Sequence, residues 1–121
     1  MQKELTPSER QITQVSSTEG ELRSDQVFSL AAETFRLMSA PMRLKIISAL
    51  CQGEKNVGQL LAQVPSTQPN MSQHLNTLHR AGVVARRREG VQIYYRIIDE
   101  RVAALCRVVC TQIAIQLDEQ A

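Results

Sequence analysis

Apolar residues recur at intervals of three and four along most of the chain, which is the spacing of one face of a helix. The first such run is DQVFSLAAETFRLM, and Ser24 or Asp25 can cap its start. A second run, SAPMRLKIISALCQG, has Ser39 as its expected cap, Pro41 in its first turn and a glycine, Gly53, at its end. Both segments are predicted to be helices.

Two shorter helical runs follow. Asn56 can cap the segment VGQLLAQV, which stops at Pro65. Ser66 or Thr67 can cap QPNMSQHLNTLHRA, which Gly82 closes. Because only the short segment PST joins the two predicted helices, they form a candidate helix-turn-helix.

The period of the pattern then changes from that of a helix toward two. The segments VVARR and VQIYYRII alternate, and Arg88, Glu89 and Gly90 separate them, which predicts a β-hairpin with its turn at these residues. Asp99 can cap a last helix, ERVAALCRVVCTQIAIQL. The predicted fold is mainly α with a β-hairpin (α+β): four helices, two strands and a final helix.

Length and composition narrow the class of protein. The 121 residues suit one domain over residues 21–121, after a flexible N-terminal tail over residues 1–20 that is rich in Gln, Ser, Thr and Glu. No apolar run is long enough to span a bilayer or to serve as a secretory signal, so we expect a cytoplasmic protein without a membrane partner. No Gly-rich phosphate loop, carboxylate pair or nucleophile with a base indicates an enzyme, and no cofactor is expected.

The formal net charge is only +2, so the placement of charge is more informative than its total. Arg86, Arg87 and Arg88 beside the predicted turn can hold phosphates or enter a minor groove. In the fourth predicted helix, short amide and hydroxyl side chains lie largely outside the apolar stripe and can bond to base edges. Either feature alone is typical of a solvated surface, but together they favour double-stranded DNA as a partner. The polar residues are Gln68, Asn70, Ser72, Gln73 and Asn76.

Four segments in this order, LMSAPMRLKIISAL, NVGQLLAQV, MSQHLNTLHRAGVV and RRREGVQIYYRI, resemble the ArsR/SmtB winged-helix repressors. The resemblance covers roughly residues 25–115. It implies a winged helix-turn-helix homodimer that packs through its first and last helices, binds an inverted-repeat operator and lets go when an inducer binds. It also implies that the hairpin is the wing and that five residues face DNA: Gln68, Asn70, Ser72, Gln73 and His74.

Most metal ligands known in this family are missing from the chain. The third predicted helix, in EKNVGQLLAQ, holds no thiol where arsenic sensors of the family have several. On the last helix Asp99 is present, but Arg101, Gln112 and Ile115 occupy the positions of the family's His, His and Glu. His74 has no second ligand one turn away, so we expect it to bond to backbone or phosphate. No metal site of the known zinc, nickel or cadmium type is therefore expected.

Three cysteines remain, and their odd number argues against a disulfide framework in a reducing compartment. Cys51 ends the second predicted helix, and Cys106 and Cys110 are one turn apart on the last. Cys106 lies in the apolar stripe, as a structural cysteine would. Arg107 lies three residues before Cys110 and can favour its thiolate.

The persulfide- and redox-sensing members of the family use one cysteine in the second helix and one in the last. By this resemblance Cys51 and Cys110 form a sensor pair that oxidants or sulfane sulfur link, although each is displaced about one helical turn from the positions in that group. Two alternatives remain open. Cys51, Cys106 and Cys110 can bind arsenite or antimonite as three thiolates, or they can simply fill space in a constitutive DNA-binding protein.

Overall fold

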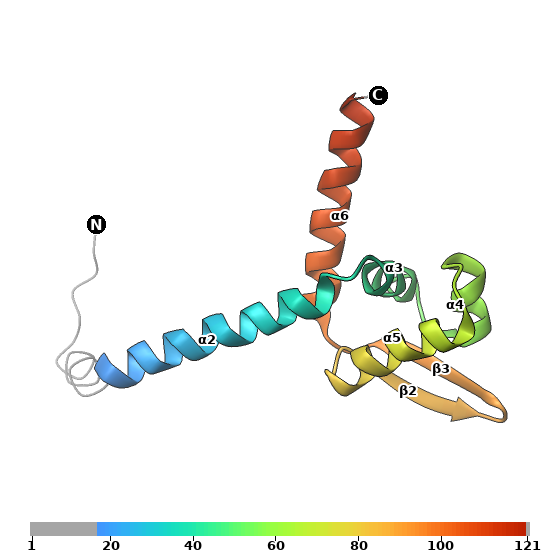
Figure 1. Ribbon diagram of the computed structural model, residues 1–121, viewed down its shortest axis with the longest axis horizontal. Coiled ribbons are helices and arrows are strands. Elements are labelled where there is room, and N and C mark those ends of the chain that lie inside the picture. The colour runs from blue at the N-terminus through green and yellow to red at the C-terminus, as the bar shows by residue number, and fades with distance from the viewer. Residues whose placement is uncertain (1–16, 121) are drawn as a thin grey trace. The chain divides into compact units, whose positions relative to one another are not determined.

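A computed structural model describes residues 17–120 (Figure 1). The chain divides into two units, residues 1–35 and residues 36–121, and each is described by itself. Most of the flexible tail predicted for residues 1–20 lies outside the described residues. The prediction was wrong at the end of that tail, because residues 17–20 are already helical.

Helix α2, Ser17–Met38, runs through the first unit. The predicted caps Ser24 and Asp25 lie inside this helix, so the predicted start was wrong. Both residues are exposed, and a short polar side chain that points into solvent is compatible with a helix interior. Along the first unit the large apolar side chains of α2 are exposed: Leu22, Val27, Phe28, Leu30 and Phe35.

The second unit begins with the last residues of α2, and helix α3, Pro41–Leu50, follows. Pro41 lies in the first turn as predicted, but the N-cap residue is Ala40 rather than Ser39. The Ser39 hydroxyl instead donates to the carbonyl of Arg36 at 2.7 Å. The helix ends at Leu50 with Cys51 as its C-cap, so it stops slightly before the predicted glycine.

Helix α4, Val57–Gln63, begins with a capping box. The Asn56 side chain accepts from the Gln59 amide at 2.8 Å, and the Gln59 side chain accepts from the Asn56 amide at 2.9 Å. This exchange satisfies two amides that the first turn of a helix leaves unpaired. Asn56 is therefore confirmed as the cap of this helix.

Helix α5, Gln68–Arg80, follows after a short connection. Thr67 caps it as predicted, and the threonine hydroxyl accepts from the Asn70 amide at 3.2 Å. Gly82 follows the helix at a φ of 77°, a conformation that favours glycine. Helices α4 and α5 pack against each other, which confirms the predicted helix-turn-helix.

The predicted hairpin is confirmed as strands β2, Val84–Glu89, and β3, Gln92–Ile97. The predicted turn was wrong by about two residues, because Arg88 and Glu89 are paired within the ladder and Gly90 and Val91 form the turn. Gly90 has a φ of 63°, which suits the first position of a type II′ hairpin turn. A two-residue strand β1, Lys55–Asn56, adds to β3 and was too short to show a period.

Helix α6, Glu100–Gln120, completes the chain. The Asp99 carboxylate accepts from the Arg101 amide at 3.0 Å, as its predicted capping role requires. Val102, Ala103 and Cys106 are buried, and α6 packs against α3, whereas every described residue from 107 onward is exposed. Among residues 17–120, no helix is both long and apolar enough to cross a membrane.

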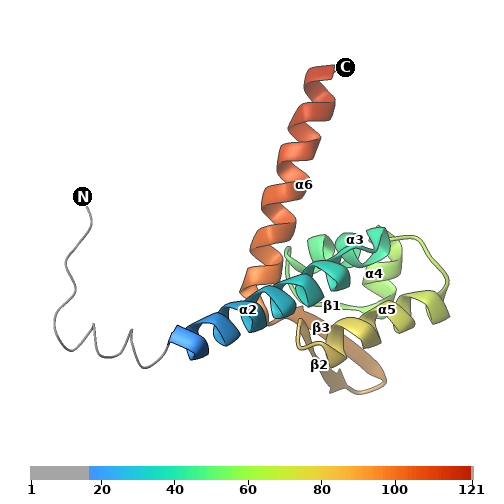
Figure 2. The ribbon, with the colours of Figure 1, turned by 60° about the vertical axis from the view of Figure 1, so that its left-hand side comes forward.

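The core of the second unit joins aliphatic side chains from α3, α4, α5, the hairpin and the start of α6. The mainly α fold with a β-hairpin wing is thus confirmed, with α5 lying alongside the hairpin (Figure 2). The fully buried large side chains are Ile46, Ile47, Leu60, Met71, Leu75, Leu78, Val83, Val84, Val102 and Cys106.

Candidate nucleic-acid interface and thiol site

The solvent face of α5 is polar and fixed in orientation. Met71, Leu75 and Leu78 on the opposite face are fully buried, so the helix cannot rotate without exposing apolar surface. Gln68, Ser72 and Gln73, which the sequence predicted to face DNA, are all exposed. The helix therefore presents hydrogen-bonding side chains of the kind that read base edges.

Asn70 and His74 lie on one flank of α5 and are half-buried. The Asn70 side chain donates to the Ser66 hydroxyl at 2.8 Å, so it also fixes the turn before the helix. The His74 Nδ1 lies 3.4 Å from Nη1 of Arg43. Because a guanidinium can only donate, Nδ1 is the acceptor of this contact.

Arg43 is a residue that sequence reasoning missed. Besides its contact with His74, its Nε donates to the carbonyl of Leu37 at 2.6 Å. It therefore connects the recognition helix to the segment that precedes α3. The sequence offers little signal, because Arg43 and Lys45 both interrupt the apolar run PMRLKII and only the structure shows that Arg43 is half-buried and Lys45 exposed.

The three wing arginines are exposed but differ in their contacts. Successive residues of a strand point to opposite faces, so Arg86 and Arg88 share one face and Arg87 lies on the other. Within residues 17–120, no salt bridge engages Arg86 or Arg88. These two cations are therefore unneutralised and suited to phosphate.

Arg87 is held by two carboxylates. Its Nη2 lies 2.6 Å from Oε1 of Glu54, and its Nη1 lies 2.6 Å from Oε2 of Glu89. Its guanidinium carbon is also 4.7 Å from the ring centroid of Tyr94. The hydrogen bond from Arg87 lowers the pKa of Glu54, and the bond to Glu54 raises the pKa of Arg87. Arg87 is thus bound to carboxylates of the protein itself, and the DNA contacts of the three arginines stay predictions.

In the described part of the chain all three cysteines are free thiols. Cys106 is only 2% exposed, and its sulfur lies 3.9 Å from that of Cys110, which is exposed. Burial, and then hydrogen bonding to Cys110, raises the pKa of Cys106 to about 11. The charges of Cys110 and Cys51 contribute to the same rise in the pKa of Cys106.

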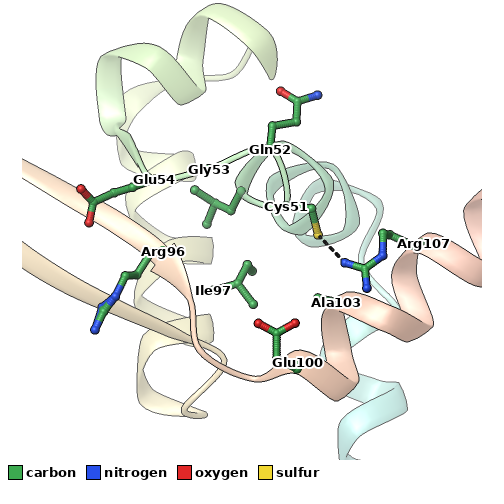
Figure 3. A pocket seen from close by; sticks show the side chains of 10 residues that line it. Cys51, Gln52, Gly53, Glu54, Arg96, Ile97, Glu100, Ala103 and Arg107 are labelled. Carbon is green, nitrogen blue, oxygen red and sulfur yellow. Dashed lines mark hydrogen bonds between the residues drawn. The ribbon is translucent and has the colours of Figure 1, made fainter.

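Cys51 is half-buried and faces the last helix (Figure 3). The Nη1 of Arg107 donates to its sulfur at 3.9 Å, so the cation expected beside Cys110 lies at Cys51 instead. Cys51 and Arg107 line a cleft of about 270 Å³ together with residues 52–54, Arg96 and Glu100. The cleft connects the end of α3, the strand β3 and the start of α6.

No group of three or more His, Cys, Asp or Glu side chains within residues 17–120 is arranged to hold a metal ion. The three cysteines likewise form no such group. The sulfurs of Cys106 and Cys110 are close to each other, whereas the sulfur of Cys51 contacts Arg107.

Taken together, the α4–α5 pair, the polar face of α5 and the basic hairpin define a winged helix-turn-helix DNA-binding domain. The family model described as "Bacterial regulatory protein, arsR family" matches residues 40–86. The chain is 36% identical over 96 residues to the biofilm growth-associated repressor of Xylella fastidiosa strain Temecula1, over 76% of this chain and 81% of that protein. This chain belongs to the arsR family of bacterial regulatory proteins.

Solved structures agree with this assignment. The transcriptional repressor BigR from Xylella fastidiosa has a TM-score of 0.66 and 34% identity, over 78% of this chain and 93% of that chain. Reduced HlyU from Vibrio cholerae N16961 has a TM-score of 0.68 and 28% identity, over 72% and 92%. A homodimeric winged helix-turn-helix DNA-binding domain from Mycobacterium bovis has a TM-score of 0.68 and 30% identity, over 80% and 90%. The predicted family is confirmed, and the chain is a transcriptional regulator rather than an enzyme.

Proposed function

We propose that this protein is a homodimeric repressor that releases its operator when reactive sulfur species or an oxidant link Cys51 to Cys110. The observation that carries the proposal is the meeting of α3 and α6 at a thiol, where Arg107 of α6 contacts the sulfur of Cys51. Helix α3 belongs to the body that holds the recognition helix. A covalent link between these helices would therefore act on the DNA-binding unit.

Operator binding is supported by the polar face of α5 and by Arg86 and Arg88 on the wing. The Xylella relative is described as a repressor, and we extend that role to this chain. An inverted-repeat operator in double-stranded DNA follows from two copies that each offer one recognition helix. A reducing cytoplasm suits this function, because it keeps the cysteines reduced until a reactive sulfur species or an oxidant arrives.

The homodimer is supported by apolar surface on α2 and on α6, each considered by itself. Phe28 of α2 is 70% exposed and Val108 of α6 is 62% exposed. Helices with such surfaces usually bury them against another chain. The Mycobacterium bovis relative is described as homodimeric. On α6 the exposed apolar residues are Val108, Val109, Ile113, Ile115 and Leu117.

The chemistry balances with inorganic polysulfide as the oxidant. The thiolate of one cysteine attacks a sulfane sulfur, expels a shorter polysulfide and becomes a persulfide. The second thiolate attacks the inner sulfur of that persulfide and expels hydrosulfide, which leaves a disulfide. Where both cysteines carry a persulfide, one attacks the inner sulfur of the other and expels hydrosulfide. The product is then a bridge of three sulfurs, which spans a wider gap than a disulfide.

A link between Cys51 and Cys110 would join two helices, and for this reason we favour it over a link between Cys106 and Cys110. Cys106 and Cys110 lie on one helix, so a bond between them leaves the relation of α6 to α3 unchanged. Cys106 is also buried, and its raised pKa keeps it a neutral thiol at pH 7. Since the thiolate is the reacting form, Cys106 is the slowest of the three to react.

The test is operator release by inorganic polysulfide, followed by fluorescence anisotropy of a labelled operator duplex. Cys51→Ser and Cys110→Ser should each keep the operator bound under conditions that release the wild type. Cys106→Ser is the matched control and should release it as the wild type does. Release that survives both of the first two replacements would show that the switch lies elsewhere. If the wild type stays bound to the operator at every polysulfide concentration, the protein is instead a constitutive DNA-binding protein.

The arsenite alternative has less support. It requires three thiolates around one ion, and the described residues hold no such group. Soft ions would still bind such a site if it formed. Titrating the reduced protein with arsenite in the operator assay should therefore give no release below the concentrations that modify thiols in general.

A further inference from the structure

Glu54 joins the wing to the body of the domain. It lies in the segment between α3 and β1, and its carboxylate takes three hydrogen bonds from Arg87 of β2, at 3.0, 3.1 and 2.6 Å. The bond from Arg87 to Glu89 differs in kind, because both of these residues belong to the strand β2. Glu54 is thus the partner through which Arg87 ties the hairpin to a segment outside it.

The same segment begins at the thiol proposed as the sensor. Cys51 and Glu54 are three residues apart and line the same cleft, as Figure 3 shows. Gly53 between them has a φ of 137°, a conformation that other residues rarely adopt. Because only two residues separate Cys51 from Glu54, a displacement of the backbone at Cys51 is expected to reach Glu54.

The cleft brings this segment together with α6 and the wing. Arg107 of α6 contacts the sulfur of Cys51, and Arg96 of β3 lies on the wing side of the same cleft. Sulfur atoms added to Cys51, or a bridge drawn from it toward α6, would therefore enter the space that the Glu54 segment borders. Strand β1, which follows Glu54 directly, pairs with β3 of the wing.

We propose that Glu54 is a positioning residue for DNA binding. Through Arg87 it holds the wing where Arg86 and Arg88 reach the phosphates, and through residues 51–54 it transmits modification of Cys51 to the wing. The transmission rests on the proposed thiol switch, whereas the positioning role does not.

The positioning role is tested on the reduced protein with an operator duplex over a range of salt concentrations. Glu54→Gln removes a negative charge, so charge alone would strengthen binding to DNA. We expect the opposite, a loss of about tenfold in affinity, because the wing cations are no longer held in place. Glu54→Asp keeps the negative charge on a shorter side chain. Its affinity for the operator should lie between those of the wild type and Glu54→Gln.

Glu89→Gln is the matched control, because it makes the same change of charge at the other carboxylate that contacts Arg87. It should bind the operator within about twofold of the wild type, since no tie to the body is lost. A second readout is the effect of Arg88→Gln. This replacement should weaken binding by about threefold or more in the wild type and much less in Glu54→Gln. Equal or tighter binding by Glu54→Gln, or an undiminished effect of Arg88→Gln, would overturn the positioning role.

The transmission is tested by hydrogen exchange of the amides in residues 86–92, with intact and peptide masses that report whether Cys51 is modified. Polysulfide should speed exchange in the wing of the wild type and add nothing further in Glu54→Gln, where exchange is already fast. Unchanged exchange in a protein whose Cys51 is modified would overturn the transmission and leave the thiol switch intact. If Cys51 never reacts, the thiol switch and the transmission fail together, and the operator assay still decides the positioning role.

Discussion

Arg107 donates a hydrogen bond to the sulfur of Cys51 across 3.9 Å, which places a cation of the last helix against a thiol at the end of α3. The two residues are 56 positions apart in the chain. Their contact makes the reactivity of Cys51 depend on α6, and it brings an anionic reagent toward Cys51 by charge attraction.

Replacing Arg107 with Gln should therefore change which reagents Cys51 prefers. The rate of its reaction with iodoacetate, an anion, should fall by about threefold more than its rate with the neutral iodoacetamide. Peptide mass spectrometry of timed samples measures both rates. Arg101→Gln is the control, because Arg101 lies on the same helix but pairs with Asp99. An equal drop for both reagents would contradict the attraction of anions by Arg107.

The two unneutralised wing arginines should account for part of the salt dependence of DNA binding. Each phosphate contact contributes about one unit to the slope of log affinity against log salt. Arg86→Gln and Arg88→Gln should each lower that slope by about one and weaken binding to operator and random duplex alike. Gln73→Ala should instead lower the preference for operator over random duplex and leave the slope unchanged. A slope that Arg86→Gln and Arg88→Gln do not alter would remove the wing from the interface.

The buried thiol of Cys106 should make stability fall at high pH. Its pKa is about 11 in the folded chain against 9.0 as the ordinary value, so the unfolded chain loses the proton first as pH rises. The stabilisation is complete below about pH 9 and should be lost between about pH 9 and pH 11, with a magnitude of the order of 2 kcal/mol. Urea unfolding at several pH values measures it.

The control for this effect is Cys106→Ala, because the difference between it and the wild type isolates the contribution of the Cys106 thiol. Cys110→Ala replaces the exposed neighbour of Cys106 and should still show most of the decline in stability at high pH. A decline that is identical in the wild type and in Cys106→Ala would assign the effect to other groups.

The exposed apolar residues of α6 should be needed for dimerisation. Ile113 is 49% exposed, and a carboxylate placed there would be buried without a partner if a second chain covers it. Ile113→Glu should shift the protein toward monomer in sedimentation velocity and weaken operator binding. Gln112→Glu makes a similar charge change on a neighbouring polar residue and should remain dimeric. A dimer that tolerates Ile113→Glu would exclude this face of α6 as the interface.

The element order and most element boundaries could be predicted because each depends on local chemistry. The caps Asn56 and Thr67 each bond to an amide three residues further on, so both were predictable from the sequence, Thr67 with Ser66 as its alternative. The start of α2 could not be predicted in this way, because Ser24 and Asp25 are exposed polar residues of a kind that a helix tolerates in its interior. The hairpin turn was misplaced because two charged residues and a glycine, Arg88, Glu89 and Gly90, locate a turn only approximately.

The site was predictable in its residues but not in its contacts. The sequence places Arg86, Arg87 and Arg88 in one run, and only the fold shows that Arg87 is bound by Glu54, 33 positions away. Arg107 follows Cys106 directly in sequence, yet its contact is with Cys51 on another helix. Contacts between elements distant in sequence depend on tertiary packing, which a local period does not contain.

The central claim is that a sulfur link between Cys51 and Cys110 releases the operator. It is tested most directly by treating the reduced protein with graded polysulfide and measuring, in the same samples, the linked-peptide mass and the fraction of operator bound. The account predicts that the peptides holding Cys51 and Cys110 become joined and that operator release follows the joined fraction. Operator release with these two peptides unlinked, or with a link only between Cys106 and Cys110, would contradict it.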